Sequence, residues 1–226
     1  MEIYGEEWAA NYERRANAGI PGREGLYRLC QAFFLGLPAQ ARILVVGCGT
    51  EDDLIPLAKA FPEASLVAIE PAEPMLAYCS RRVAAEGLAN RVTLHPTSLQ
   101  NFESSAQFDA ATAILVSQHI FPDVAAAEFF QKIASLLKPN GRLYSADLHI
   151  GAGQDRELLL ALWREQASMS GIEPAVVQEG LVRFTTELRP RDEAVIYEFL
   201  RAAGFVNILK PFSSLIYGAW ASSKGA

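Results

Sequence analysis

Short, uninterrupted apolar segments recur through the first two thirds of the chain and alternate with longer segments of helical periodicity. The pattern predicts strands at residues 42–46, 65–69, 91–95, 110–116 and 141–147, and helices between them at residues 54–60, 74–86 and 123–137. A strand that is apolar throughout must be covered on both faces, which is what helices do in parallel sheets. The alternation therefore predicts an α/β protein with a doubly wound, mostly parallel sheet.

The two ends of the chain depart from this alternation. The remaining predicted elements are helices at residues 22–36, 155–169 and 191–203, a less regular stretch around 171–190, and a closing β-hairpin from residues 204–209 and 215–221. Neither an internal repeat nor a flexible linker divides the sequence. We therefore expect residues 1–226 to form a single domain, with an N-terminal cap segment at 1–36 and a candidate lid at 150–190.

The composition argues against several classes of function. The 226 residues carry a net charge of −6 and a sequence pI of about 5.2, whereas binding to nucleic acid needs a basic surface. The apolar stretches fall short of the roughly 20 residues that span a bilayer, and the acidic N-terminus has no apolar signal-peptide core. The three cysteines are widely spaced without a CxxC pair, which disfavours disulfides and a metal site. We expect a cytoplasmic protein that binds no membrane, nucleic acid or metal.

The first predicted strand ends in Gly47-Cys48-Gly49, and glycines let a backbone turn tightly and approach a ligand closely. In an open α/β sheet, ligands bind beyond the carboxyl ends of the strands. The third glycine of the dinucleotide-binding pattern is missing, because Glu51 stands in its place, and the acidic run at 51–53 would repel a pyrophosphate. These residues disfavour NAD and FAD and are compatible with a nucleoside cofactor that carries no phosphate.

Glu70 ends the second predicted strand about 20 residues after these glycines, where an acid that binds ribose hydroxyls is expected. The plainer alternative is that this carboxylate only caps the helix that follows. We favour ribose binding, because the acid and the glycine turn occur together at the expected spacing.

Three segments, at residues 43–50, 67–76 and 136–143, closely resemble the motifs of class I S-adenosylmethionine-dependent methyltransferases. The likeness spans about residues 40–150 in order and spacing. It implies a Rossmann-like sheet of seven strands, mostly parallel with the last strand antiparallel. It also implies S-adenosylmethionine as cofactor and S-adenosylhomocysteine as product.

The resemblance further implies roles for individual residues. The backbone of Gly47-Cys48-Gly49 would pass beside the methionine part of the cofactor. The other implied cofactor contacts are Glu70 at the ribose, Pro71 directly after it, Met75 flanking the adenine, and Ser98 and Leu99 at the base.

Two positions depart from the family pattern. Val45 and Ser98 stand where the family often has an acid. Both changes would weaken the hold on the cofactor or shift it to other groups, which leaves open a non-catalytic S-adenosylmethionine-binding protein.

The terminal segments, at residues 18–26 and 181–220, are similar to the carboxy-S-adenosylmethionine synthase branch of this fold. Arg23 occupies the place of a tyrosine that touches the methionine end of the cofactor in that branch, and it could pair with the cofactor carboxylate in a bidentate manner. The arginine with which the branch reads an extra carboxylate has no clean equivalent, since Arg183 is near but not aligned. This difference favours ordinary methyl transfer.

Methyl transfer from a sulfonium is an in-line displacement, so the protein mainly positions the acceptor and excludes water. His119 follows the fourth predicted strand and is the candidate catalytic base, with a packing role as the alternative; His149, after the fifth strand, is a weaker candidate. Tyr4, Trp8 and Tyr12 would either face the sulfonium as cation–π partners or only pin the N-terminal segment to the core.

These observations predict an S-adenosylmethionine-dependent methyltransferase that acts on a small-molecule acceptor. The alternatives are a cofactor-modifying enzyme similar to carboxy-S-adenosylmethionine synthase and a non-catalytic binding protein. A nucleic-acid methyltransferase is disfavoured, because residues 117–120 replace the Asn/Asp-Pro-Pro-aromatic motif expected there. The sequence leaves open the acceptor, the atom that is methylated, and whether the chain forms a homodimer.

Overall fold

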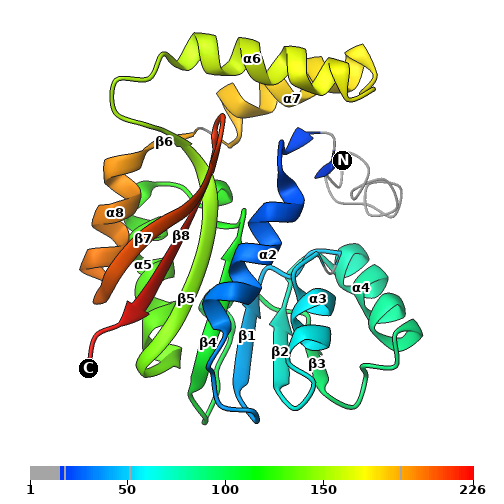
Figure 1. Ribbon diagram of the computed structural model, residues 1–226, viewed down its shortest axis with the longest axis vertical. Helices are drawn as coiled ribbons and strands as arrows, with labels where there is room; N and C mark the ends of the chain where they lie inside the picture. Colours follow the sequence, from blue (N-terminus) through cyan, green and yellow to red (C-terminus); the bar gives the residue numbers. More distant parts are fainter. Residues whose placement is uncertain (1–15, 18, 51, 189) are drawn as a thin grey trace.

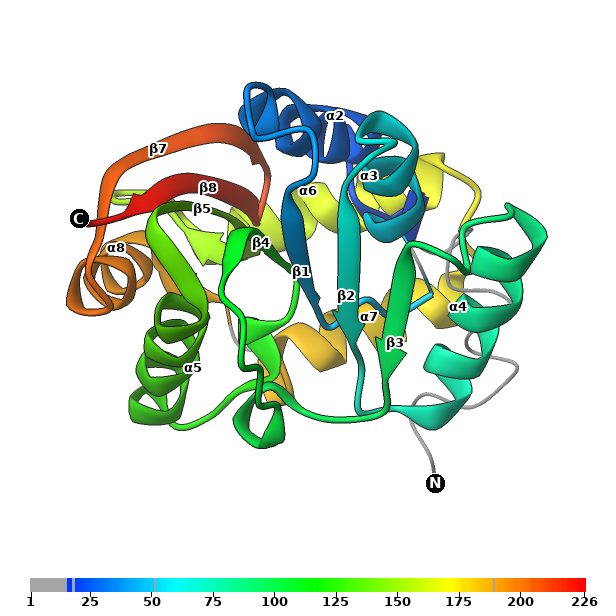
Figure 2. The same cartoon turned by 90° about the horizontal axis from the view of Figure 1, so that it is seen from below.

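The computed structural model of the protein describes residues 16–17, 19–50, 52–188 and 190–226. A central sheet runs through the molecule, with helices on both faces and a helical pair above one end (Figures 1 and 2). The strands are β1 (Arg42–Val46), β2 (Ser65–Ile69), β3 (Val92–His95), β4 (Phe108–Ile114), β5 (Leu137–Ile150), β6 (Arg191–Asp192), β7 (Phe205–Ser214) and β8 (Tyr217–Lys224). The α-helices are α2 (Arg23–Phe34), α3 (Leu54–Ala60), α4 (Glu73–Ala85), α5 (Asp123–Leu136), α6 (Arg156–Met169), α7 (Pro174–Thr186) and α8 (Glu193–Ala202).

The strand order is β3-β2-β1-β4-β5-β8-β7. Neighbouring strands from β3 to β5 pair in parallel, whereas β8 runs antiparallel to both β5 and β7. The predicted doubly wound sheet with one antiparallel final strand is therefore confirmed. The short strand β6 pairs only with the end of β5, where the sequence predicted the start of a helix.

Alternate residues of the apolar strands face the two sides of the sheet. In β1, Ile43 and Val45 pack into a core shared with α2, α3 and α4. Leu44 and Val46 pack into a second core shared with α5 and α8. Figure 2 shows α2 and α3 on one side of the sheet and α5 on the other. The uninterrupted apolar run of β1 thus reflects burial on both faces.

A pair of helices, α6 and α7, lies above the carboxyl ends of the strands, within the segment predicted as a lid (Figure 1). We call this pair the cap. The predicted irregular stretch at 171–190 is wrong, because α7 occupies most of it. Val177 and Phe184 are buried against α6 and the sheet end, and Pro174 begins the helix at a position that proline tolerates.

The apolar run predicted as a strand at 110–116 continues past the end of β4. Leu115 has a φ of 60° and ends the strand. The residues after it form the short 3-10 helix η2 (Ser117–His119), and a second one, η1 (Leu99–Asn101), follows β3. Across the described ranges, no helix has the length and apolar character needed to cross a membrane.

Candidate functional site

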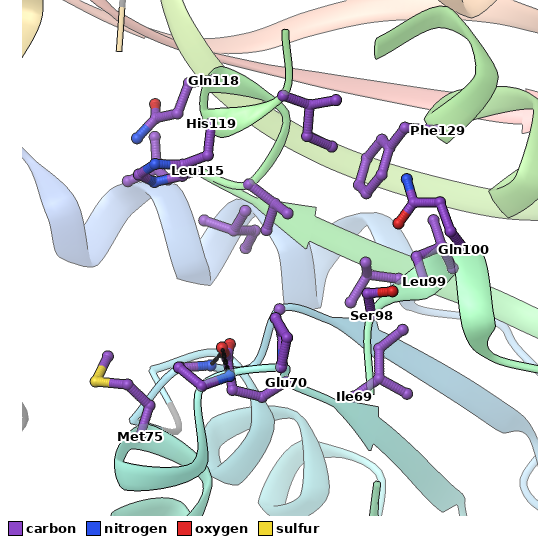
Figure 3. A pocket seen from close by; sticks show the side chains of 18 of the residues that line it. Ile69, Glu70, Met75, Ser98, Leu99, Gln100, Leu115, Gln118, His119 and Phe129 are labelled. Carbon is purple, nitrogen blue, oxygen red and sulfur yellow. Dashed lines mark hydrogen bonds between the residues drawn. The ribbon is translucent and has the colours of Figure 1, made fainter. Parts of the chain in front are cut away.

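A cavity of about 450 Å³ opens at the carboxyl ends of β1, β2 and β4, and we call it the central cavity (Figure 3). The turns after these strands form its floor and one wall, and α7 contributes to its far side. Eight of the predicted site residues line it: Gly47, Gly49, Glu70, Pro71, Met75, Ser98, Leu99 and His119. Sequence positions up to 72 residues apart thus meet at one edge of the sheet, as expected for this class of fold.

Gly47 begins the turn after β1 and cannot be replaced without strain. Its φ is 67°, a left-handed conformation that favours glycine. A Cβ atom at this position would lie 2.6 Å from Cγ2 of Val116. The Gly47 N–H donates to the carbonyl of Ile69 at 2.8 Å, which ties the turn to the end of β2. The residue therefore keeps the floor of the central cavity open.

The Glu70 carboxylate joins the glycine turn to the start of α4. Its Oε2 accepts a hydrogen bond from the Gly49 N–H at 3.1 Å, and its Oε1 accepts one from the Ala72 N–H at 2.9 Å. Burial raises the pKa of Glu70, and the two backbone N–H groups oppose this shift. Ala72 is the N-cap residue of α4, so the carboxylate also binds the backbone where this helix begins. Each carboxylate oxygen retains a further lone pair that can accept from a ligand hydroxyl.

Two buried side chains, Asp147 and Arg191, hold the segment that follows β4 in place. The Ser117 hydroxyl donates to a carboxylate oxygen of Asp147, which lies at the end of β5. Arg191 donates from one terminal nitrogen to the Ser117 carbonyl at 3.0 Å and from Nε to Asp123 at 2.9 Å. This support fixes Gln118 and His119 at the edge of the central cavity. Asp123, the first residue of α5, therefore accepts from Arg191.

Comparison with known proteins shows what the chain resembles. Residues 43–141 match the family model described as a methyltransferase domain. The fold around this segment is that of class I S-adenosylmethionine-dependent methyltransferases. The matched segment contains the glycine turn, Glu70, the residues after β3 and the segment after β4, so it includes most of the central cavity.

Solved structures share the fold of this methyltransferase at low identity. An O-methyltransferase family protein from Burkholderia thailandensis is 19% identical with a TM-score of 0.62, covering 90% of this chain and 58% of that one. Magnesium protoporphyrin IX methyltransferase from Synechocystis PCC 6803, solved with bound S-adenosylmethionine, is 18% identical with a TM-score of 0.60, covering 90% and 79%. The [4+2]-cyclase SpnF is 18% identical with a TM-score of 0.66, covering 88% and 81%.

The chain spans 55%, 58% and 67% of the length of three of the solved structures that it matches. The shared fold also includes a protein named as a cyclase. The architecture therefore does not by itself assign a reaction, which must be argued from the site. The structures named above do not confirm the resemblance of the terminal segments to the carboxy-S-adenosylmethionine synthase branch.

Two predicted cofactor residues of the methyltransferase, Arg23 and Cys48, do not line the central cavity. Arg23 forms an ion pair with Asp52 and donates to Oδ1 of Asn17 at 2.6 Å. The Cys48 side chain is buried in the core, where a hydrogen bond with Cys79 and burial raise its pKa. Their contacts with the cofactor stay predictions.

The acidic run after the glycine turn does not face the cavity in its described part. Asp52 is paired with Arg23, and Asp53 is buried and accepts from the Thr112 hydroxyl at 2.6 Å. Burial raises the pKa of Asp53 to about 6, although the Thr112 bond opposes the shift. Glu51 lies outside the described residues. Asp52 and Asp53 therefore interact with other groups of the fold. The expected repulsion of a phosphate assumed that their charges face the ligand, and the structure differs in this respect.

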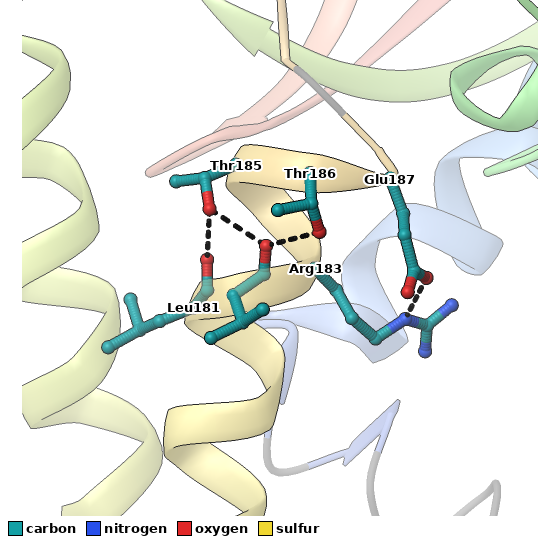
Figure 4. A network of polar contacts seen from close by, with 6 residues as sticks. Leu181, Arg183, Thr185, Thr186 and Glu187 are labelled. Carbon is teal, nitrogen blue, oxygen red and sulfur yellow. Dashed lines mark hydrogen bonds and ion pairs between the residues drawn. The ribbon is translucent and has the colours of Figure 1, made fainter.

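The electrostatics of His119 depend on the cap. Its ring lies at the solvent-accessible edge of the central cavity, and partial burial and the charge of Arg183 lower its pKa, opposed by Glu187. Arg183 of α7 lines the same cavity, and its Nε donates to Glu187 at 2.9 Å (Figure 4). The imidazole is thus neutral at pH 7. A neutral imidazole can accept a proton, which a catalytic base requires.

The other candidates of the sequence lie elsewhere. His149 is fully buried, with its ring 5.5 Å from that of Trp220, and burial lowers its pKa to about 4. Tyr4, Trp8 and Tyr12 fall outside the described residues. Within the described ranges, no three His, Cys, Asp or Glu side chains gather into a group that could hold a metal ion.

Several cavity residues were not singled out as site residues from the sequence. Leu115, Val116 and Ile120 follow β4 directly, so their position after the strand was the available signal. Arg183 comes from α7 of the cap and Leu188 from the residues after it; the sequence marked Arg183 only as an unaligned neighbour of a family arginine and did not mark Leu188. Their place in the site follows only from how α7 packs over the sheet.

Proposed function

We propose that this methyltransferase transfers the methyl group of S-adenosylmethionine to a small-molecule acceptor in the cytoplasm, with the cofactor in the central cavity. The observation that carries the proposal is the joint placement of Gly47, Gly49 and Glu70. A glycine turn, in which a Cβ at Gly47 would collide with Val116, and a half-buried carboxylate with free lone pairs meet in one cavity of about 450 Å³.

The residues present fit the parts of the cofactor. The turn at Gly47 and Gly49 offers a close backbone approach to the methionine part, and the Glu70 carboxylate can accept from ribose hydroxyls. Pro71, Met75 and Leu99 supply apolar surface for a planar base, and Ser98 supplies polar groups beside it. The family match supports this assignment, because it covers the same segments.

When bound, the cofactor supplies a methyl group on a sulfonium; a lone pair of the acceptor forms the new bond to carbon as the C–S bond breaks, and its electron pair stays on sulfur. The donor is already activated, so the chain needs to align the acceptor and exclude water. The cap and the segment after β4 enclose the side of the cavity where Gln118 and His119 lie. His119, neutral at pH 7, can receive the proton that an O–H or N–H acceptor loses.

The small-molecule acceptor is supported by the shape of the site. Arg183 of α7 lines the central cavity, so the cap covers part of its far side. The net charge of −6 disfavours nucleic acid as acceptor. The Synechocystis neighbour is named for a porphyrin substrate, which is also a small molecule.

A second candidate is a reaction that modifies the cofactor itself, and one observation favours it. Arg183 lines the central cavity, and its guanidinium could bind a carboxylate on a modified cofactor. Its ion pair with Glu187 competes with that role. Mass spectrometry of the nucleoside products would separate the candidates, since methyl transfer yields S-adenosylhomocysteine and cofactor modification yields a heavier sulfonium.

The test of the proposed function is calorimetric titration with S-adenosylmethionine and S-adenosylhomocysteine. We expect micromolar binding that Glu70→Ala abolishes or weakens by at least about tenfold, because the ribose loses its carboxylate partner. Glu73→Ala is the matched control, since Glu73 is exposed in the first turn of α4 and does not line the cavity. Absence of binding by the wild-type chain, or equal losses in both variants, would refute the cofactor assignment.

A further inference from the structure

Arg191 lies where the chain returns from the cap to the sheet (Figure 1). It is the first residue of β6, soon after α7 ends at Thr186, and its backbone pairs with His149 at the end of β5. The Arg191 residue is only 7% exposed, which is rare for an arginine unless its charge and its N–H donors have partners. The backbone of Arg191 thus fastens the end of the cap, and its side chain must find its partners inside the fold.

The guanidinium of Arg191 binds the turn that follows β4, residues 117–120, which we call the His119 turn. One terminal nitrogen donates to the Ser117 carbonyl at 3.0 Å, and the other donates to the Ile120 carbonyl at 2.5 Å. These two carbonyls stand on either side of His119 in the sequence, and His119 lines the central cavity. A single planar group with two parallel donors therefore spans the turn that presents His119 to the site.

The orientation of this guanidinium is fixed on its other sides as well. Its Nε donates to Oδ1 of Asp123 at 2.9 Å. The guanidinium carbon lies 4.9 Å from the ring centroid of Phe121 and 5.6 Å from that of Phe199 in α8. Contacts of this kind stabilise a cation over an aromatic ring. Because the group is held along its edge and over its faces, its two terminal donors stay aligned with the carbonyls of the His119 turn.

A plainer role for Arg191 is to neutralise the buried acid Asp147. Burial raises the pKa of Asp147 to about 6, and the Ser117 hydroxyl and the charge of Arg191 oppose this shift. Neutralisation needs only a positive charge, which a lysine also carries. Binding two carbonyls at once needs the planar fork of a guanidinium, which a lysine lacks. The variant Arg191→Lys therefore separates the two roles.

Arg91 makes the same kind of contact in a part of the fold that does not line the central cavity. Its terminal nitrogens donate to the carbonyls of Ala58, Phe61 and Ala64 at 2.8 to 3.2 Å. These bonds join the end of α3 to the residue that precedes β3. Arg91→Lys is therefore a matched control, because it removes a guanidinium fork from backbone carbonyls without touching the His119 turn.

We infer that Arg191 is a positioning residue of the methyl-transfer reaction, which sets the place of the His119 imidazole by holding the carbonyls of Ser117 and Ile120. This role rests on the proposed function, in which His119 receives the proton that an O–H or N–H acceptor loses. Arg191 does not line the central cavity, so it acts through the His119 turn. Since its backbone also ends the cap, the attachment of the cap and the placement of His119 depend on the same residue.

The test follows the His119 imidazole by NMR titration in the full chain, in Arg191→Lys and in Arg91→Lys. Burial and the charge of Arg183 lower the pKa of His119, and the charge of Glu187 opposes them. The lowering depends on where the ring lies, so a loosened turn should move the midpoint toward 6.5. We expect an upward shift of at least about half a pH unit in Arg191→Lys and no shift in Arg91→Lys.

Amide hydrogen exchange gives a second readout on the backbone of the turn. The His119 N–H donates to the Val116 carbonyl at 3.0 Å, and the Ile120 N–H donates to the Ser117 carbonyl at 2.9 Å. Both N–H groups should exchange at least about tenfold faster in Arg191→Lys, because opening the turn then breaks fewer contacts. Exchange in β1 and β2 should stay unchanged. A loss of global stability alone would not move the His119 midpoint of the folded chain.

Asp123→Ala carries the test if Arg191→Lys does not fold. The Asp123 side chain is 58% exposed, and its removal frees only the Nε of Arg191. The midpoint of His119 should then shift in the same direction by a smaller amount. An unchanged midpoint and unchanged exchange of the His119 turn in the variant that folds would overturn the inference and leave Arg191 as a charge that neutralises Asp147.

Calorimetric titration with S-adenosylhomocysteine distinguishes this inference from the proposed function. We expect the affinity of Arg191→Lys to differ from that of the wild-type chain by less than about threefold, because the glycine turn and Glu70 are untouched. A larger loss would mean that Arg191 supports the cofactor site, and it would overturn the inference. If the wild-type chain binds and the His119 turn is unchanged in Arg191→Lys, only the positioning role is refuted. If the wild-type chain binds neither form of the cofactor, the proposed function is refuted, whatever the result at His119.

Discussion

The central cavity and a smaller cavity of about 160 Å³ under the cap, the cap cavity, share four residues but are built in different ways. The floor of the central cavity is made by strand-end turns whose backbone is held by other backbone groups and by Glu70. The cap cavity is made by side chains of two helices that pack on each other through Trp163 and Phe184. Backbone turns tolerate few residue types, whereas aromatic walls can be rebuilt from many.

This difference separates the two parts of the proposed reaction. The cofactor part depends on local backbone geometry that glycines and one carboxylate impose. The acceptor part depends on the side chains with which the cap lines the cavity beneath it. Changes in the cofactor part should therefore abolish cofactor binding. Changes in the acceptor part should alter only which acceptor is methylated.

The largest effect is expected from Gly47→Ala. The new Cβ would lie 2.6 Å from Val116 in a left-handed backbone with φ of 67°. We expect the affinity for S-adenosylmethionine to fall by about a hundredfold or more, because the floor of the cavity must shift. Calorimetry measures the affinity, and thermal unfolding measures the stability.

Gly87→Ala is the matched control for Gly47→Ala. Gly87 has a φ of 69°, and nothing lies within 4 Å of its added Cβ. This variant should lose about 1–2 kcal/mol of stability from the backbone strain alone and keep its cofactor affinity. Equal losses of affinity in the two variants would show that left-handed strain, and not contact with Val116, is responsible.

Gly180→Ala addresses the cap and should have a smaller, local effect. The added Cβ would displace Trp163, so we expect a loss of about 1–3 kcal/mol in the stability of the cap and faster hydrogen exchange in α6 and α7. The affinity for S-adenosylhomocysteine should change less than about twofold, because neither Gly180 nor Trp163 lines the central cavity.

Gly25→Ala is the control for that variant, since its Cβ in helix α2 would meet Phe212 only at 3.9 Å, an ordinary contact. It should leave the exchange in α6 and α7 unchanged. A tenfold loss of cofactor affinity in Gly180→Ala would contradict the independence of the two regions.

The smallest effect is expected at His119, because the charge of Arg183 in the cap lowers the pKa of this residue of the central cavity. The pKa of His119 in the folded chain lies below the ordinary 6.5. As the pH falls, the unfolded chain therefore binds a proton at His119 before the folded chain does. The contribution of neutral His119 to the free energy of unfolding is therefore present above pH 6.5 and is lost as the pH falls toward the pKa of the folded chain. NMR titration of the imidazole should give a midpoint below 6.5.

Two variants of α7 should move that midpoint in opposite directions. Arg183→Gln removes a positive charge and should raise the pKa of His119, whereas Glu187→Gln removes a negative charge and should lower it. High salt should reduce both shifts. Shifts of the same sign in both variants would mean that packing, and not charge, couples the cap to His119.

The sequence predicted the elements around the cofactor more closely than those of the cap. The predicted strands at 42–46 and 65–69 coincide with β1 and β2, because apolar β-branched runs between turn residues have few alternatives. The cap helix α7 was missed, although Val177, Leu181 and Phe184 have helical spacing, because Gly180 and the flanking polar residues weaken the pattern.

The individual site residues follow the same division. Gly47, Gly49 and Glu70 were identified from spacing alone, since turn geometry and strand ends are local properties of a chain. Arg23 was placed at the cofactor from a resemblance, whereas the structure pairs it with Asp52. No local pattern distinguishes an arginine that faces a ligand from one that neutralises a neighbouring acid.

The sequence by itself determined the doubly wound sheet, the position of the glycine turn and the acid at the end of β2. These features depend on the periodicity of apolar residues and on backbone conformations that few residues adopt. Only the tertiary structure decided that Gln118 lines a cavity together with Trp163 and Tyr217, and that the charge of Arg183 on α7 acts on His119. Contacts between segments far apart in the chain arise from packing, and packing is a property of the folded chain as a whole.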